Sequence, residues 1–147
     1  MLFRSLMKEA VAKDAEAFEA YMKARRLPRD TEQQKADRIQ AIQAASINAA
    51  QVPLHVARSA VQILKLAVRS AEIGNVNAIS DAGAGAQFAQ AAFKGAGLNV
   101  RINLLGLERE SDPASMLNEL RGLEKQAEKM DASLREILNE RGGLNIN

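Results

Sequence analysis

The sequence of 147 residues contains no cysteine and no tryptophan, and aromatic side chains make up only 3% of it. Without cysteine the chain forms no disulfide and offers no thiolate for catalysis, which fits a reducing compartment such as the cytoplasm. Because large rings are scarce, the hydrophobic 47% of the residues must build a core mainly from Ala, Leu, Ile, Val and Met. Such side chains favour closely packed helices.

Long apolar runs and a strong net charge are also missing. No stretch approaches the roughly 20 apolar residues that a membrane span requires. The formal net charge is only +2, and basic residues alternate with acidic ones instead of forming a block. We therefore expect no membrane segment and no nucleic-acid partner.

The positions of proline, glycine and helix-capping residues predict an all-α bundle of about five helices in a single domain, residues 1–147. Pro28 ends the first helix, and Thr31 with Gln34 forms the capping box of the second. Pro53 fits the first position of a third helix. The expected ranges are Ser5–Arg26, Thr31–Ala50, Pro53–Gly74, a long Ala/Gly-rich helix that ends near Leu107 with a kink at Gly95–Gly97, and Asp112–Gly142.

Four polar residues crowd the start of the Ala/Gly-rich helix, namely Asn75, Asn77, Ser80 and Asp81. Free backbone N–H groups at a helix start favour anions, so these residues are candidates for substrate binding. A simpler interpretation has equal weight. Asp81 also interacts well with the helix dipole, and Asn77 or Ser80 would serve equally as a helix cap.

Asn99 and Asn103 lie four residues apart and so share one face of the same predicted helix, in line with Ala92, Gly95 and Ala96. Small residues let a second helix approach closely. A buried amide without a partner costs roughly 1–3 kcal/mol, so the asparagines must find hydrogen bonds there. This face is therefore either a polar helix interface or a ligand site, and the pattern does not decide between them.

Asp14 is the candidate for acid–base chemistry. It lies in an apolar stripe of the first predicted helix, together with Met7, Ala10, Phe18 and Tyr21. A carboxylate on such a stripe is expected to be partly buried, which raises its proton affinity toward the useful range. Periodicity alone favours the alternative, an aspartate at a packing boundary that pairs with Lys or Arg.

Four blocks resemble the formiminotransferase-cyclodeaminase family, in the same order as in that family. The family comprises the C-terminal cyclodeaminase domain of a bifunctional folate enzyme and stand-alone bacterial relatives, some of which are methenyltetrahydrofolate cyclohydrolases. The blocks are DAEAFEAYMKARRLP (Asp14–Pro28), VPLHVA (Val52–Ala57), GNVNAISDAG (Gly74–Gly83) and GAGLNVRINL (Gly95–Leu104).

The resemblance implies a cytoplasmic, homodimeric enzyme of folate one-carbon metabolism and histidine degradation. Its reaction would be either closure of formiminotetrahydrofolate to methenyltetrahydrofolate with release of ammonia, or hydrolysis of methenyltetrahydrofolate. The family's catalytic aspartate falls on Asp14, while Asn99, Arg101 and Asn103 become candidates for contacts with the folate. Folate is the substrate, and neither a metal nor a bound cofactor is implied. His55 is the only histidine, and we expect it at the solvated edge of a helix.

Members of the family carry further helix before the aspartate block, including a glycine-rich segment to which nothing here corresponds. We therefore expect this chain to be an N-terminally truncated form of the domain. The alternative to an enzyme is a non-catalytic helical dimerisation subunit or an inactive fragment, because a groove of small residues serves helix pairing as well as ligand binding.

Overall fold

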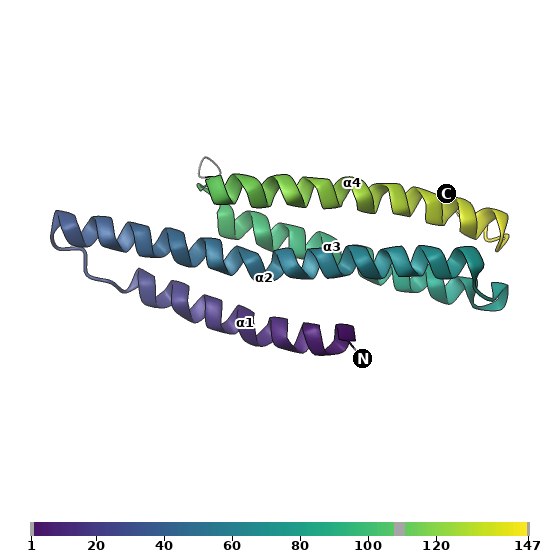
Figure 1. The fold of residues 1–147 in the computed structure, drawn as a ribbon, viewed down its shortest axis with the longest axis horizontal. Helices are drawn as coiled ribbons and strands as arrows, with labels where there is room; N and C mark the ends of the chain where they lie inside the picture. The colour runs from purple at the N-terminus through teal and green to yellow at the C-terminus, as the bar shows by residue number, and fades with distance from the viewer. Residues whose placement is uncertain (1, 108–110, 147) are drawn as a thin grey trace.

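The computed structural model describes residues 2–107 and 111–146, and over these residues it contains four α-helices and one short 3-10 helix (Figure 1). The expected all-α class is confirmed, whereas the expectation of about five helices is wrong. The elements are α1 (Leu2–Arg25), α2 (Glu32–Ile73), η1 (Val76–Ala78), α3 (Ile79–Leu104) and α4 (Ser111–Glu140).

Helix α2 explains the difference in number, because it runs through the proline at which two separate helices were expected. Its start is as expected: the Thr31 side chain accepts a hydrogen bond from the Gln34 backbone N–H at 3.2 Å, and the Gln34 side chain accepts one in return from the Thr31 backbone N–H. Pro53 is buried inside the helix. Burial of Ala50 and Leu54 on either side of Pro53 keeps the helix continuous across the missing hydrogen bond.

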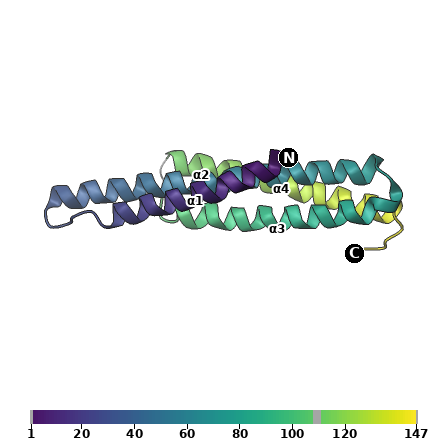
Figure 2. The same cartoon turned by 90° about the horizontal axis from the view of Figure 1, so that it is seen from below.

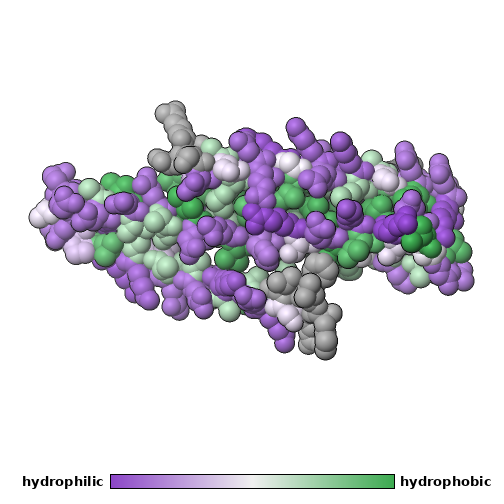
Figure 3. All heavy atoms as spheres, in the orientation of Figure 1, coloured by the Kyte–Doolittle hydropathy of each residue, from purple (hydrophilic) through white to green (hydrophobic). Residues whose placement is uncertain are grey.

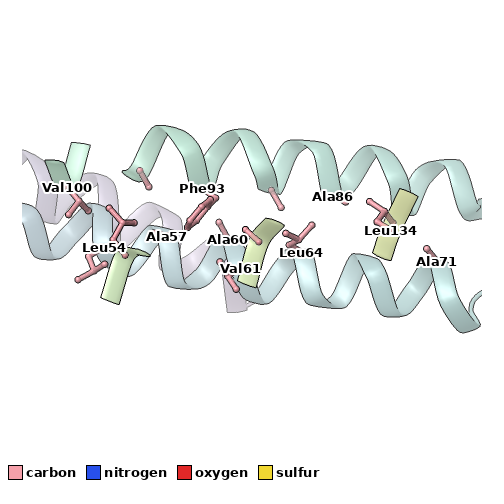
Figure 4. Packing of buried hydrophobic residues seen from close by; sticks show 14 of the residues in the cluster. Leu54, Ala57, Ala60, Val61, Leu64, Ala71, Ala86, Phe93, Val100 and Leu134 are labelled. Carbon is pink, nitrogen blue, oxygen red and sulfur yellow. The ribbon is translucent and has the colours of Figure 1, made fainter. Parts of the chain in front are cut away.

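The most extensive contact between helices is that of α2 with α3, which lie side by side and run in opposite directions (Figure 2). Their facing side chains form the core, which Figure 4 shows from close by. Phe93 of α3 is the one aromatic ring among the buried core residues of the described chain, and it lies between Ala57 and Ala60 of α2 (Figure 4). Helix α4 closes the core from one side and contributes Leu120, Ala127, Leu134 and Leu138.

Gly83 on the inner face of α3 allows α4 to pack closely, because a Cβ atom there would lie 3.2 Å from a methyl carbon of Leu138. At Gly97 the atom nearest to a Cβ would be a guanidinium nitrogen of Arg101 at 3.2 Å, and the methyl carbon of Leu120 at 3.7 Å would be in ordinary contact. The helix passes through Gly97 as one continuous element, so no separate segment begins there, and it ends at Leu104, before the expected Leu107.

The far end of the bundle is held by Arg141, just after α4. Its guanidinium donates hydrogen bonds to the carbonyl oxygens of Ala71 at 2.6 Å and of Gly74 at 2.7 Å. Carbonyl groups at a helix end lack donors within their own helix, so this arginine caps the last turn of α2. It thereby joins the end of α4 to the turn that leads into α3.

Helix α1 lies against α2 on the side away from α4 (Figure 1). Hydrophilic residues cover most of the outer surface of the helices on the face shown in Figure 3, and hydrophobic residues appear mainly between them. No helix in the described part of the chain is both long enough and apolar enough to cross a bilayer.

Candidate active site

The contact between α1 and α2 is made by small side chains, which bring the two backbones close together. Ala17 and Ala24 are buried, and the ring of Tyr21 is half-buried between them. The guanidinium of Arg38 in α2 donates two hydrogen bonds, of 3.2 and 3.0 Å, to the carbonyl oxygen of Arg25 at the end of α1. These contacts fix the position of the helix that carries Asp14.

A groove of about 600 Å³ runs along one flank of this contact. Its charged rim on α1 contains Lys13, whose ammonium lies 2.7 Å from a carboxylate oxygen of Glu9. The hydrogen bond from Lys13 lowers the pKa of Glu9, and the same bond raises the pKa of Lys13. The residues that line the groove are Glu9, Ala10, Lys13, Glu16, Ala17, Asn48, Gln51, Val52, His55 and Arg58.

Arg58 stands between this groove and a second hollow of about 440 Å³ at the start of α4. Its guanidinium makes a bidentate ion pair with Glu119, with N–O distances of 2.5 and 2.8 Å. The hydrogen bonds from Arg58 lower the pKa of Glu119, and Glu119 raises the pKa of Arg58. Planar groups paired in this way hold a fixed geometry, so the pair connects α2 to α4 beside both hollows.

Asp14 lies outside the groove, and the expectation that it is partly buried is wrong. At 100° per residue, Asp14 is on the opposite side of the buried Ala17 from Lys13. Helix α2 covers the middle of this face and leaves the flank of Asp14 in solvent, where Phe18 is 62% exposed. The burial that was expected to raise its proton affinity is therefore absent, and Asp14 is an accessible carboxylate beside an accessible aromatic ring.

The polar residues before α3 lie at the end of the bundle where α2 turns into α3. The Asn75 side chain accepts a hydrogen bond from the Asn77 backbone N–H at 3.0 Å and so caps the 3-10 helix. Asn77, Ser80 and Asp81 are exposed. The alternative that Asn77 or Ser80 caps the Ala/Gly-rich helix is wrong, because α3 begins after Ala78 without a side-chain capping bond and Asn75 caps the preceding 3-10 helix instead. The substrate-binding role of these residues stays a prediction.

Asn99 and Arg101 lie near the opposite end of α3, and both have partners within the chain. The Asn99 amide donates to the Gly95 carbonyl oxygen of its own helix at 3.1 Å. Arg101 donates to the Gly97 carbonyl oxygen at 3.2 Å and to a carboxylate oxygen of Glu124 in α4 at 2.7 Å. Arg101 therefore contacts α4 in this structure, and the exposed Asn99 is the more accessible of the two.

Asn103 has a different partner, which lies on another helix. Its amide donates to the Ala49 carbonyl oxygen of α2 at 3.5 Å. In an unbroken helix that carbonyl would accept from the N–H of the residue four positions later, which is Pro53 and has no N–H. Asn103 thus supplies the donor that the proline removes, which favours the helix-interface interpretation for this one residue.

The candidate residues on α3 form two groups that are too far apart for one small ligand. Ser80 and Asn99 are 19 residues apart on a continuous helix, or roughly 28 Å at 1.5 Å per residue. Asn103 and the turn of α1 that carries Asp14 both lie beside the same part of α2, near Ala49. The turn of α1 that carries Asp14 therefore lies toward the Asn103 end of the bundle and is separated from the Asn75–Asp81 group.

Sequence reasoning missed the groove on α1 and α2. Glu9, Lys13 and Glu16 are spaced by four and three positions, so the sequence could have indicated one charged face of α1. Which residues of α2 face them depends on how the two helices pack, and the sequence pattern does not contain this information. His55 is exposed as expected. Within residues 2–107 and 111–146, no three His, Asp or Glu side chains converge where a metal ion could bind.

Comparison with known proteins gives consistent matches over most of the chain. The model of the Formiminotransferase-cyclodeaminase family matches residues 3–122. A protein of Methylorubrum extorquens AM1 named methenyltetrahydrofolate cyclohydrolase is 38% identical over 131 residues, or 89% of this chain. Proteins named formimidoyltransferase-cyclodeaminase are 32% identical over 128 residues in Sus scrofa and 30% identical over 128 residues in Gallus gallus, each over 87% of this chain.

The matched region is only part of each relative. It covers 63% of the bacterial protein and 24% of each animal protein. The match to the family model nevertheless includes Asp14, Pro53 and the whole of α3, which are the parts from which the candidate site is built. This chain belongs to the formiminotransferase-cyclodeaminase family.

Proposed function

We propose that this chain acts on a tetrahydrofolate derivative that carries a one-carbon unit, with hydrolysis of methenyltetrahydrofolate as the first candidate reaction. The observation that carries the proposal is the 38% identity, over 89% of the chain, to a protein named methenyltetrahydrofolate cyclohydrolase. Formiminotetrahydrofolate cyclodeamination is the second candidate, favoured by the 32% and 30% identity to two proteins named for that activity. A cytoplasmic location and the absence of a bound cofactor stay predictions.

Asp14 is assigned the proton transfers of the hydrolysis. Water adds to the methenyl carbon and loses one proton to the Asp14 carboxylate. The same group then protonates the ring nitrogen that leaves as the carbon–nitrogen bond breaks, and the remaining hydroxyl proton passes to solvent as the formyl carbonyl forms. An exposed carboxylate is accessible to substrate and water, and Phe18, one turn further along α1, offers a ring against which a flat pterin can stack. Asn99, the exposed one of the two asparagines, is the candidate for a hydrogen bond to the pterin edge.

The test is to follow methenyltetrahydrofolate by its absorbance with purified full-length chain, and to assay formiminotetrahydrofolate in parallel for the appearance of the same chromophore. Asp14→Asn keeps the size of the side chain and removes the titrating proton, so turnover should fall roughly 100-fold or more. Glu19→Gln is the matched control, since Glu19 is an exposed carboxylate of α1 outside the candidate site.

Equal rates for wild type and Asp14→Asn would remove Asp14 from the mechanism. Absence of turnover with either substrate, together with absence of folate binding by calorimetry, would support the alternative of a non-catalytic helical subunit or inactive fragment.

A further inference from the structure

After α4 the chain turns back along the bundle instead of continuing outward (Figure 2). Gly143 has a φ of 64° and Asn145 a φ of 49°, so two left-handed residues reverse the chain within a few positions. Asn145 is the one non-glycine residue with positive φ in the described part of the chain. This backbone region is unfavourable for residues with a side chain, although asparagine tolerates it better than most. Contacts outside the turn must therefore hold it in place, and we call residues 142–146 the α4 strap.

One side chain in the last turn of α4 holds the strap. The Asn139 amide donates a hydrogen bond to the Ile146 carbonyl oxygen at 2.9 Å, and its oxygen accepts one from the Ile146 N–H at 2.7 Å. A single amide thus pairs with both backbone groups of one residue, as a neighbouring β-strand would. Both bonds are exposed, so water competes for them and they stabilise the closed position only weakly. Arg141 fixes the base of the strap through its bonds to the end of α2.

The strap forms one wall of a hollow of about 460 Å³ between the N-terminal half of α3 and the C-terminal half of α4. Leu134 and Leu138 of α4 and Gly83 of α3, all buried, contribute the inner lining. Leu144 and Ile146 of the strap add apolar side chains, which are 43% and 40% exposed. Since packing between α3 and α4 holds the inner lining, the hollow stays formed when the strap moves. The polar residues of the lining are Ser80, Gln87, Asp131 and Arg135.

We propose that the α4 strap is a releasable cover, and that the hollow beneath it binds a small molecule with a flat apolar body and one polar group. The contacts of the strap support its release, because only two exposed hydrogen bonds clip it to α4 and the left-handed backbone of Asn145 opposes them. The lining supports the class of ligand, since apolar walls with a few polar groups are the usual pattern of a small-molecule site. Ser80 offers a hydroxyl and Gln87 an amide to the polar group of the ligand.

This hollow lies apart from the candidate active site. Ser80 is roughly 28 Å from Asn99 along α3, and Asp14 lies toward the opposite end of the bundle. Of the residues predicted to bind substrate, only Ser80 lines the hollow. The family model matches residues 3–122, so the strap and the residues of α4 that line the hollow lie beyond the matched part. A ligand bound there would not contact Asp14, and the proposal does not depend on the proposed function.

The first test measures hydrogen exchange of the Ile146 amide by NMR in the full chain. We expect exchange at least about 10-fold slower than that of a free amide in the wild type, because Asn139 accepts a hydrogen bond from this N–H. Asn139→Ala removes the clip, and Asn145→Val disfavours the left-handed turn, so each should abolish the protection. Asn118→Ala is the matched control, because Asn118 is an exposed asparagine near the other end of α4. An unprotected Ile146 amide in the wild type, or protection that is kept in both variants, would overturn the proposal.

The second test measures the binding of anilinonaphthalene sulfonate, a flat apolar probe with one polar group, by its fluorescence. Release of the strap should raise the affinity for the probe at least about 5-fold in Asn139→Ala and in Asn145→Val, with helix content by circular dichroism unchanged. Gln87→Phe, added to either variant, fills the hollow and should reverse the gain. Equal affinity in the wild type and both open variants, or a gain that survives Gln87→Phe, would refute the ligand site. Neither test requires folate or turnover, so this proposal and the proposed function can fail independently.

Discussion

The hydrogen bond between Asn103 and Ala49 should be energetically coupled to Pro53, and a double-mutant cycle measures that coupling. Asn103→Ala removes the donor and leaves the Ala49 carbonyl oxygen without a partner. Both residues are half-buried, and the bond of 3.5 Å is longer than the usual range of about 2.7–3.2 Å. We therefore expect a loss of about 1 kcal/mol, at the lower end for an unsatisfied backbone group.

Pro53→Ala changes the reference state of the same carbonyl. Alanine restores an N–H four residues after Ala49, so the Ala49 oxygen regains a donor from its own helix. In that background Asn103→Ala should cost only a few tenths of a kcal/mol. The lost volume of the buried proline ring and its effect on the unfolded chain appear on both sides of the cycle and cancel.

The assay is urea unfolding followed by circular dichroism, at one protein concentration for all four proteins because association adds to apparent stability. The coupling free energy should be about 1 kcal/mol, which corresponds to roughly 2–4 °C in Tm for a chain of this size. Additive effects, with a coupling below about 0.3 kcal/mol, would refute the idea that Asn103 compensates for the proline.

Four further outcomes are expected. Arg141→Ala should lower the free energy of unfolding by about 1.5–3 kcal/mol in the same assay, since a charged group donates two short hydrogen bonds to the end of α2. The pKa of Glu119 is lowered in the folded chain by its bond to Arg58. The pair therefore stabilises the fold at pH values above the pKa of Glu119 in the unfolded chain, and this stabilisation is lost as the pH falls through its pKa in the folded chain. Because the pair is exposed, Glu119→Gln should remove less than about 1 kcal/mol of this pH-dependent stability. Gly122→Ala should raise Tm through about 0.5–1 kcal/mol of helix propensity, whereas Gly74→Ala should lower it, because a Cβ there would overlap the Ser70 carbonyl oxygen.

Local signals in the sequence predicted the helix ends well, because capping depends on neighbours in the chain. Thr31 with Gln34, and the stop at Gly74, follow from groups within four residues of one another. Pro53 was misread for the opposite reason. Its effect on α2 is offset by a side chain 50 positions later in the sequence, and no local pattern contains that information.

Two asparagines of the candidate site illustrate the same limit. Asn99 and Asn103 are equivalent by spacing, yet one bonds within its own turn of α3 and is exposed, while the other reaches α2. Their difference depends on where α2 crosses α3. Asp14 was expected within the apolar stripe that packs, but it lies beside the packing face, because exposure there depends on how far α2 extends over α1, which periodicity does not specify.

The glycines of α3 differ in what surrounds them. A Cβ atom at Gly83 would lie 3.2 Å from a methyl carbon of Leu138, so glycine there lets α4 pack closely. Gly85 and Gly95 have no heavy atom near the place of a Cβ, and glycine in a helix interior costs about 1 kcal/mol relative to alanine. No contact in the described part of the chain offsets this cost. Gly95→Ala should therefore raise the free energy of unfolding by about 0.5–1 kcal/mol in the urea assay, and an unchanged or lower value would show that the outer face of α3 is covered at this position.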